Sequence, residues 1–115
     1  MEIRFTVPGR PVPCVRMTQR SKYKSKKAQR YLAYKDVVGW VARTKIKTPM
    51  EGPVGLAVDV FWDGKGQCGD WDNLGKSISD ALNHIAYEDD RRIKDGHVHI
   101  EVGEPERVEV RVWQL

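Results

Sequence analysis

The sequence predicts a single α+β domain, in which helices pack on a mixed, mainly antiparallel β-sheet. Two observations predict this class: four segments carry strand patterns and two carry helical spacing, and they follow one another in the order βαβαββ. A chain of 115 residues has room for one hydrophobic core, and no repeat or low-complexity tract divides it. We therefore interpret residues 1–115 as one domain.

The N-terminal part predicts a strand, a long loop and a helix. Residues 2–7 alternate apolar and polar side chains and are stopped by Pro8. Residues 10–26 contain further prolines and no periodicity, which indicates a long basic loop of the kind that is often functional. Residues 27–45 have helical spacing, and Ser25 can cap that helix. The apolar positions that recur there are Tyr31, Tyr34, Val38, Val41 and Ala42.

The remaining elements follow after a break rich in proline and glycine. Residues 54–62 are β-branched and aromatic, as in a strand, and residues 73–85 have the spacing of a second helix. Two final strands are expected over residues 91–102 and 107–114. The Gly-Glu-Pro-Glu sequence at 103–106 predicts that these two strands form a hairpin.

The positive charge is concentrated in one segment. Residues 10–47 hold 12 of the 20 basic residues and one acidic residue, so the segment carries +11 and the rest of the chain −7. Such a segment suits a polyanion, although a solvated basic face has the same composition. Tyr23, Tyr31 and Tyr34 lie within it and can either stack on bases or serve the core. The residues expected to contact DNA are Arg16, Arg20, Lys22, Lys24, Lys26, Lys27 and Arg30.

Composition also excludes several classes of protein. No run approaches the roughly 18 apolar residues that a membrane helix needs, and the N-terminus does not have the pattern of a secretory signal. Cys14 and Cys68 are too few for a disulfide scaffold and lack the spacing of a metal finger. We expect a cytoplasmic protein that makes no membrane contact.

Carboxylates surround the second predicted helix. Asp70 and Asp72 are two residues apart, so in an extended approach to the helix their side chains point the same way. Lys76 and Asp80 are one turn apart on the polar face. Asp90 follows after a short loop, and the chain then returns toward the sheet. This arrangement predicts that Asp70, Asp72 and Asp90 meet at one end of the helix.

Three carboxylates in one place favour a divalent cation. They repel one another unless a cation neutralises them, and oxygen ligands without thiolates suit Mg²⁺ or Mn²⁺. Such an ion polarises a phosphodiester, and Lys76 could stabilise the transition state or position the attacking water. A purely structural alternative also exists: Asp72 caps the helix, Asp80 pairs with Lys76, and residues 88–90 form a solvated turn.

The motif Asp-x-Asp-Asn-Leu-x-Lys-x-x-x-Asp-Ala-Leu, which starts at Asp70 and is followed shortly by Asp-Asp, resembles the signature of the RusA family of Holliday junction resolvases. The resemblance implies that Asp70, Asp72 and Asp90 bind magnesium and that Lys76 is needed for cleavage. Asp80 matches a recurrent acid with a supporting role. The family also implies a homodimer that nicks four-way DNA junctions symmetrically, encoded by a bacterium or a phage.

Two departures from the family pattern leave choices open. The stretch between Leu82 and Asp89 is one residue shorter, so either Asp89 or Asp90 can be the third ligand. Trp71 stands where an aliphatic residue is usual, and its ring either packs in the core, which we favour, or contacts an unstacked base.

Two weaker patterns have ordinary explanations. His97 and His99 alternate on a strand as metal ligands can, but edge-strand surface histidines fit equally well. Residues 63–65 match the Asp-x-Lys core of another nuclease superfamily, although they are better explained as a turn. The sequence thus supports a Mg²⁺-dependent endonuclease for branched DNA, and the alternative is a DNA-binding module that has this fold and does not cleave.

Overall fold

The computed structural model describes residues 1–16 and 25–115, and it confirms the α+β class and the element order βαβαββ. The elements are β1 (Glu2–Pro8), α2 (Lys26–Lys45), β2 (Val54–Trp62), α3 (Trp71–Ala81), the 3₁₀-helix η1 (Asp90–Arg92), β3 (Ile93–Val102) and β4 (Arg107–Gln114).

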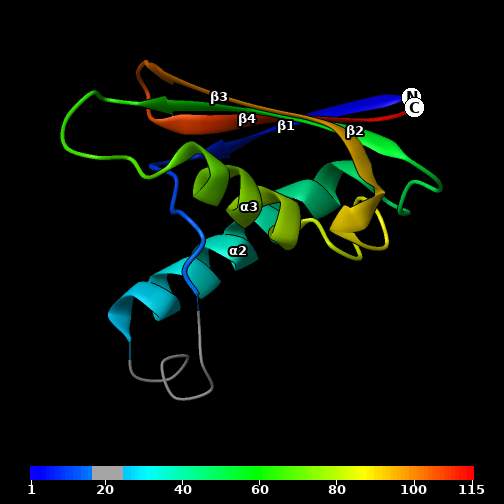
Figure 1. The fold of residues 1–115 in the computed structure, drawn as a ribbon, viewed down its shortest axis with the longest axis horizontal. Helices are drawn as coiled ribbons and strands as arrows, with labels where there is room; N and C mark the ends of the chain where they lie inside the picture. Colours follow the sequence, from blue (N-terminus) through cyan, green and yellow to red (C-terminus); the bar gives the residue numbers. More distant parts are fainter. Residues whose placement is uncertain (17–24) are drawn as a thin grey trace.

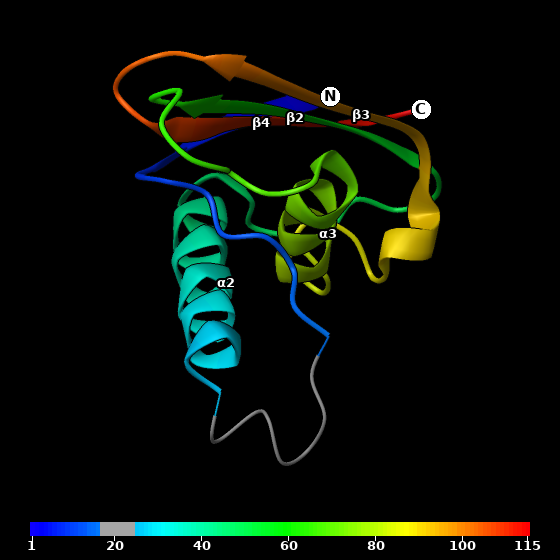
Figure 2. The same ribbon diagram turned by 60° about the vertical axis from the view of Figure 1, so that its left-hand side comes forward.

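The four strands form one mixed sheet with both helices on the same side. The strand order is β1-β4-β2-β3; β4 runs antiparallel to both its neighbours, and β3 runs parallel to β2. α2 lies in the crossover from β1 to β2, and α3 in the crossover from β2 to β3. Because such crossovers are almost always right-handed and both step in one direction, their helices cover one face. Figures 1 and 2 show this two-layer arrangement.

The predicted hairpin of the last two strands is wrong. β3 and β4 are not neighbours, because β2 lies between them and pairs with each. Residues 103–106 carry the chain past the end of β2, where the Gly103 amide donates to the Trp62 carbonyl at 2.9 Å. In this position both backbone edges of β4 have a hydrogen-bonding partner, β1 on one side and β2 on the other, and its apolar residues Val108, Val110 and Val112 are at most 1% exposed beneath the helices.

The core lies between the sheet and the two helices. Every second residue of β2 and β4 points toward the helices, and both helices contribute a buried stripe. Tyr31 and Tyr34 belong to this core, so of the two alternatives left open for them, packing in the core is confirmed and stacking on bases is wrong. Ser25 caps α2 as expected, since its hydroxyl accepts from the Ala28 amide at 3.2 Å. The largest fully buried side chains include Tyr31, Tyr87, Leu74, Ile78, Leu82, Val58 and Val60.

The second helix is shifted relative to the predicted residues 73–85. It begins at Trp71 and ends at Ala81, because the chain turns sharply afterwards: His84 has φ +67 and its amide donates to the Tyr87 carbonyl at 2.7 Å. Gly75 lets α3 approach β3 closely, since a Cβ there would lie 2.6 Å from Val98 Cγ2. The helix that carries the acidic motif is therefore held tightly against the sheet.

Candidate active site

Asp70 and Asp72 lie at the start of α3. Asp70 is the residue before the first helical turn, with φ −73 and ψ 144, and its carbonyl accepts from the Leu74 amide at 2.9 Å. Asp72 is already inside the first turn, so the predicted extended approach with parallel side chains is wrong. Both carboxylates are exposed, and Asp70 makes no side-chain capping bond. The structural explanation that Asp72 caps the helix is also wrong.

The N-terminal loop is fixed to this end of α3. The Cys14 amide donates to the Asn73 carbonyl at 2.9 Å. Gly69 precedes Asp70 with φ +118, and a Cβ there would lie 3.0 Å from Pro13 Cβ, so glycine is required by both conformation and space. The segment that leads into the basic region therefore lies directly beside Asp70.

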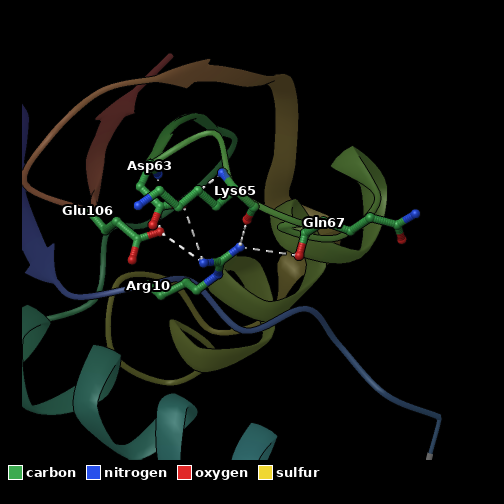
Figure 3. Close-up of polar contacts among 5 residues, drawn as sticks. All are labelled: Arg10, Asp63, Lys65, Gln67 and Glu106. Carbon is green, nitrogen blue, oxygen red and sulfur yellow. Dashed lines mark hydrogen bonds and ion pairs between the residues drawn. The ribbon is translucent and has the colours of Figure 1, made fainter.

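Arg10 ties the same region to the sheet. Its Nη2 donates to the Lys65 carbonyl at 2.7 Å, and its Nη1 lies 3.4 Å from Glu106 Oε2 and 3.6 Å from Asp63 Oδ1 (Figure 3). The Asp63 carboxylate also accepts from the Lys65 amide at 2.8 Å, which confirms that residues 63–65 form a turn. Arg10 thus holds the glycine-rich loop before Asp70. Sequence reasoning missed this role, because Arg10 has no acidic neighbour along the chain.

Asp89 and Asp90 have different environments. Asp89 caps η1: its Oδ1 accepts from the Arg91 amide at 2.8 Å and from Arg91 Nε at 3.1 Å. These contacts hold the pKa of Asp89 below its usual value, and the hydrogen bond from the Arg91 backbone amide has the largest effect. For Asp90, burial raises the pKa, and so do hydrogen-bonding contacts with Asp89 and Asp80. Asp90 and Asp80 therefore form a close pair of carboxyl groups.

Tyr87 fixes the loop that brings Asp90 to α3. Its ring is fully buried, and its hydroxyl donates to the Ser79 carbonyl at 2.7 Å. Burial raises the pKa of Tyr87, and the negative charges of Asp90 and Asp80 raise it further. The Asp80–Asp90 pair consequently lies beside a rigid anchor near the end of α3.

The carboxylates form two groups along α3 and do not form one triad. Asp70 and Asp72 lie at its first turn and Asp80 near its last; at about 1.5 Å per residue, Asp70 and Asp80 are roughly 15 Å apart along the axis. Within residues 1–16 and 25–115, no three His, Cys, Asp or Glu side chains are close enough together to hold a metal ion. The set of Asp70, Asp72 and Asp90 remains a prediction.

The donor chemistry nevertheless fits a hard divalent cation. Mg²⁺ commonly takes only one or two carboxylates and completes its shell with water and substrate phosphate. Asp80 and Asp90 are two such carboxyl groups. Burial raises the pKa of Asp90, and the nearby Asp89 and Asp80 carboxyl groups raise it further, so a counter-charge would favour the ionised form. His97 and His99 lie on the edge strand β3, paired with Asp95 at 2.7 Å and Glu101 at 3.5 Å, as expected for surface histidines.

A basic cleft adjoins Asp70. It has a volume of about 540 Å³ and lies between the N-terminal loop, the first turns of α2 and the start of α3. Three cations line it together with the Asp70 carboxylate and the Asn73 amide: Arg16, Lys27 and Arg30. Lys26 lies in the same first turn of α2 and is exposed. Arg20, Lys22 and Lys24, also predicted to contact DNA, lie outside the described residues. So does Tyr23, for which base stacking and core packing were both left open.

Two exposed side chains of α3 flank the acidic motif. Trp71 is 64% exposed, so our preference for core packing is wrong; the buried stripe of the helix runs through Leu74, Ile78 and Ala81 and does not include position 71. Lys76 is exposed one turn after Asp72.

Comparison with known protein families decides the class of protein. Residues 8–113 match the family described as endodeoxyribonuclease RusA. The chain belongs to this family. It is accordingly an endodeoxyribonuclease, an enzyme that hydrolyses phosphodiester bonds in DNA. The match confirms the resemblance based on the acidic motif, and it covers the basic segment, both helices and most of the sheet.

Two further findings complete the comparison. A search of curated proteins found no match. In the described part of the chain, no helix is long and apolar enough to cross a membrane.

Proposed function

We propose that this RusA family member resolves Holliday junctions and other branched DNA by Mg²⁺-dependent hydrolysis, in the cytoplasm of a bacterium. One observation carries the proposal: the cleft lined by Arg16, Lys27 and Arg30 has the Asp70 carboxylate at its edge. The cations attract the DNA backbone without regard to sequence. A backbone phosphate that enters this cleft comes next to the acidic motif, where hydrolysis would occur.

Asp70, Asp72 and Asp90 are the proposed metal ligands, with Mg²⁺ or Mn²⁺ as the ion. Because they lie in two groups along α3, Asp70 and Asp72 would hold an ion at its first turn, and Asp90, beside Asp80, would hold one near its last turn. Asp90 is preferred to Asp89 because the Asp89 carboxylate already accepts two hydrogen bonds from Arg91. When bound, the metal would polarise the phosphodiester and lower the pKa of the attacking water.

The remaining roles belong to basic and aromatic side chains. Lys76, exposed on α3 one turn beyond Asp72, would supply positive charge to the phosphate as negative charge develops in the transition state. Lys26, Lys27 and Arg30 would hold the DNA backbone against the start of α2. Trp71, exposed beside Asp70 and Asp72, would contact an unstacked base at a branch point.

The proposal is tested by removing single carboxylates. Asp70→Asn, Asp72→Asn and Asp90→Asn should each lower the cleavage rate by at least about 100-fold, the scale for removing one well-placed electrostatic group. Junction binding should survive or tighten, since each change removes a negative charge close to the phosphates. Rates are measured on a synthetic four-way junction, with binding measured in parallel by gel shift.

Asp89→Asn is the matched control, because it removes the same charge one residue away. It should retain most of the activity, and an inactive Asp89→Asn beside a fully active Asp90→Asn would reverse the assignment of the third ligand. Undiminished cleavage by both Asp70→Asn and Asp72→Asn would refute the site. Binding without any Mg²⁺-dependent nicking by the unaltered protein would instead support the non-cleaving DNA-binding module.

A further inference from the structure

The hydroxyl of Tyr31 connects the basic helix with the acidic pair. Tyr31 lies in α2 and is 2% exposed, and its hydroxyl donates to Asp80 Oδ2 at 3.3 Å across the helix interface. Burial raises the pKa of the Tyr31 hydroxyl, and the adjacent Cys14 and Asp80 raise it further. The hydroxyl therefore keeps its proton near neutral pH and acts as the donor.

Asp80 in turn lies beside Asp90. The Asp80 carboxyl group is close enough to Asp90 to raise its pKa, and Asp90 belongs to η1, which follows α3 in the chain. The contacts from Tyr31 to Asp80 to Asp90 thus join α2, α3 and η1. Each of these elements carries residues assigned above to DNA or metal binding.

The other buried tyrosines show that this contact is specific. Tyr34 lies one turn further along α2, and its buried hydroxyl has no hydrogen-bond partner among the described residues. Tyr87 donates to a backbone carbonyl. A phenylalanine ring would fill the core equally well at position 31, and burying a hydroxyl is unfavourable unless it forms a hydrogen bond. The Tyr31 hydroxyl therefore has a use beyond packing.

We propose that Tyr31 is a positioning residue that orients Asp80 and thereby sets the geometry of the Asp80–Asp90 carboxylate pair relative to α2. The proposal rests on the proposed function, in which Asp90 is a metal ligand. Hydrogen-bond donors behind carboxylates at a metal site hold them in their binding orientation, and removing one typically costs 10- to 100-fold in metal affinity or activity. Tyr31 would also hold that carboxylate pair at a fixed position relative to Lys27 and Arg30, which lie at the start of α2, the helix that carries Tyr31.

Two variants of α2 form a matched pair. Tyr31→Phe and Tyr34→Phe each remove one buried hydroxyl and keep the ring, but only the first removes a contact with a carboxylate. Mn²⁺ binding to the DNA-free protein is measured by calorimetry, and the Mg²⁺ concentration for half-maximal junction cleavage is measured separately. Tyr31→Phe should weaken Mn²⁺ binding by about 10-fold and raise the half-maximal Mg²⁺ concentration similarly, while Tyr34→Phe stays within about twofold of the unaltered protein.

Equal Mn²⁺ affinity in Tyr31→Phe and Tyr34→Phe would overturn the proposal. If Tyr31→Phe does not fold, Asp80→Ala is used in its place, and Mn²⁺ affinity unchanged in that variant would overturn it equally. Asp90→Asn separates this inference from the proposed function. Normal Mn²⁺ binding and cleavage by Asp90→Asn would refute the ligand assignment itself, whereas an inactive Asp90→Asn beside an unaffected Tyr31→Phe would refute only the role of Tyr31.

Discussion

At the scale of single residues, the proposed metal ligand Asp90 also affects stability. Its raised pKa means that the folded state favours the protonated carboxyl, so the free energy of unfolding falls as pH rises above the usual aspartate value of 3.8. Asp90→Asn removes this unfavourable charge and can still donate a hydrogen bond to Asp80 or Asp89. Without metal at neutral pH, it should stabilise the protein by about 0.5 kcal/mol, raising Tm by roughly 2 to 4 °C.

Thermal unfolding in EDTA at several pH values measures this effect. The stabilisation should be present near pH 7 and disappear as pH falls below the usual aspartate range, where Asp90 is protonated in both states. Asp36→Asn, which removes an exposed acid from α2, serves as the control and should show no such pattern. A lower Tm for Asp90→Asn than for the unaltered protein at pH 7 would contradict the account of the acidic pair.

The acidic motif could be recognised from sequence, but its hydrogen-bonding partners could not. Aspartates at fixed spacing around a helix carry their own pattern. Arg10 and Tyr31 reach residues 49 to 57 positions away, and nothing local marks them. The different environments of Asp89 and Asp90 likewise depend on the 3₁₀ turn, which only the structure shows.

At the scale of elements, the two ends of α2 should contribute differently to DNA binding. Lys27 and Arg30 line the cleft at its first turns, whereas Lys45 and Lys47 lie at or beyond its last turn. Replacing Lys27 and Arg30 with alanine should weaken binding to any DNA, because fewer phosphates are then neutralised. The log–log salt slope should fall by roughly 0.9 for each phosphate that the variant no longer binds.

Titration of a junction in EDTA at several salt concentrations measures the slope. The Lys45→Ala, Lys47→Ala double variant has the same change in net charge and should keep the slope of the unaltered protein. Equal reductions in both double variants would mean that net charge, and not the cleft, determines binding.

Local sequence patterns predicted the bounds of the helices and strands better than they predicted which strands pair. β2 and β4 have the predicted bounds, and α2 is within one residue, because periodicity and breakers are local signals. The position of β4 between β1 and β2 depends on contacts distant in sequence, which periodicity does not contain. The start of α3 was missed by two residues because either Asp70 or Asp72 can precede a first helical turn.

At the scale of the whole molecule, the proposed junction substrate favours a dimer. A four-way junction has approximate two-fold symmetry, and resolution needs two nicks in strands of like polarity, whereas the chain contains one copy of the acidic motif. A two-fold homodimer would place one site on each symmetry-related strand. Light scattering at micromolar concentration should give twice the chain mass, and a cruciform plasmid should acquire paired nicks in one binding event. A monomer that produces only singly nicked circles at early times would be incompatible with this assembly.

The central claim is that this RusA family enzyme cleaves DNA at branches with the help of a divalent metal. Its most direct test is the nicking of a synthetic four-way junction with and without Mg²⁺, beside a linear duplex of the same arm sequence. We predict symmetric nicks in the junction with Mg²⁺, none in EDTA, and little cleavage of the duplex under either condition. Equal cleavage of junction and duplex, or junction cleavage that persists in EDTA, would contradict the account.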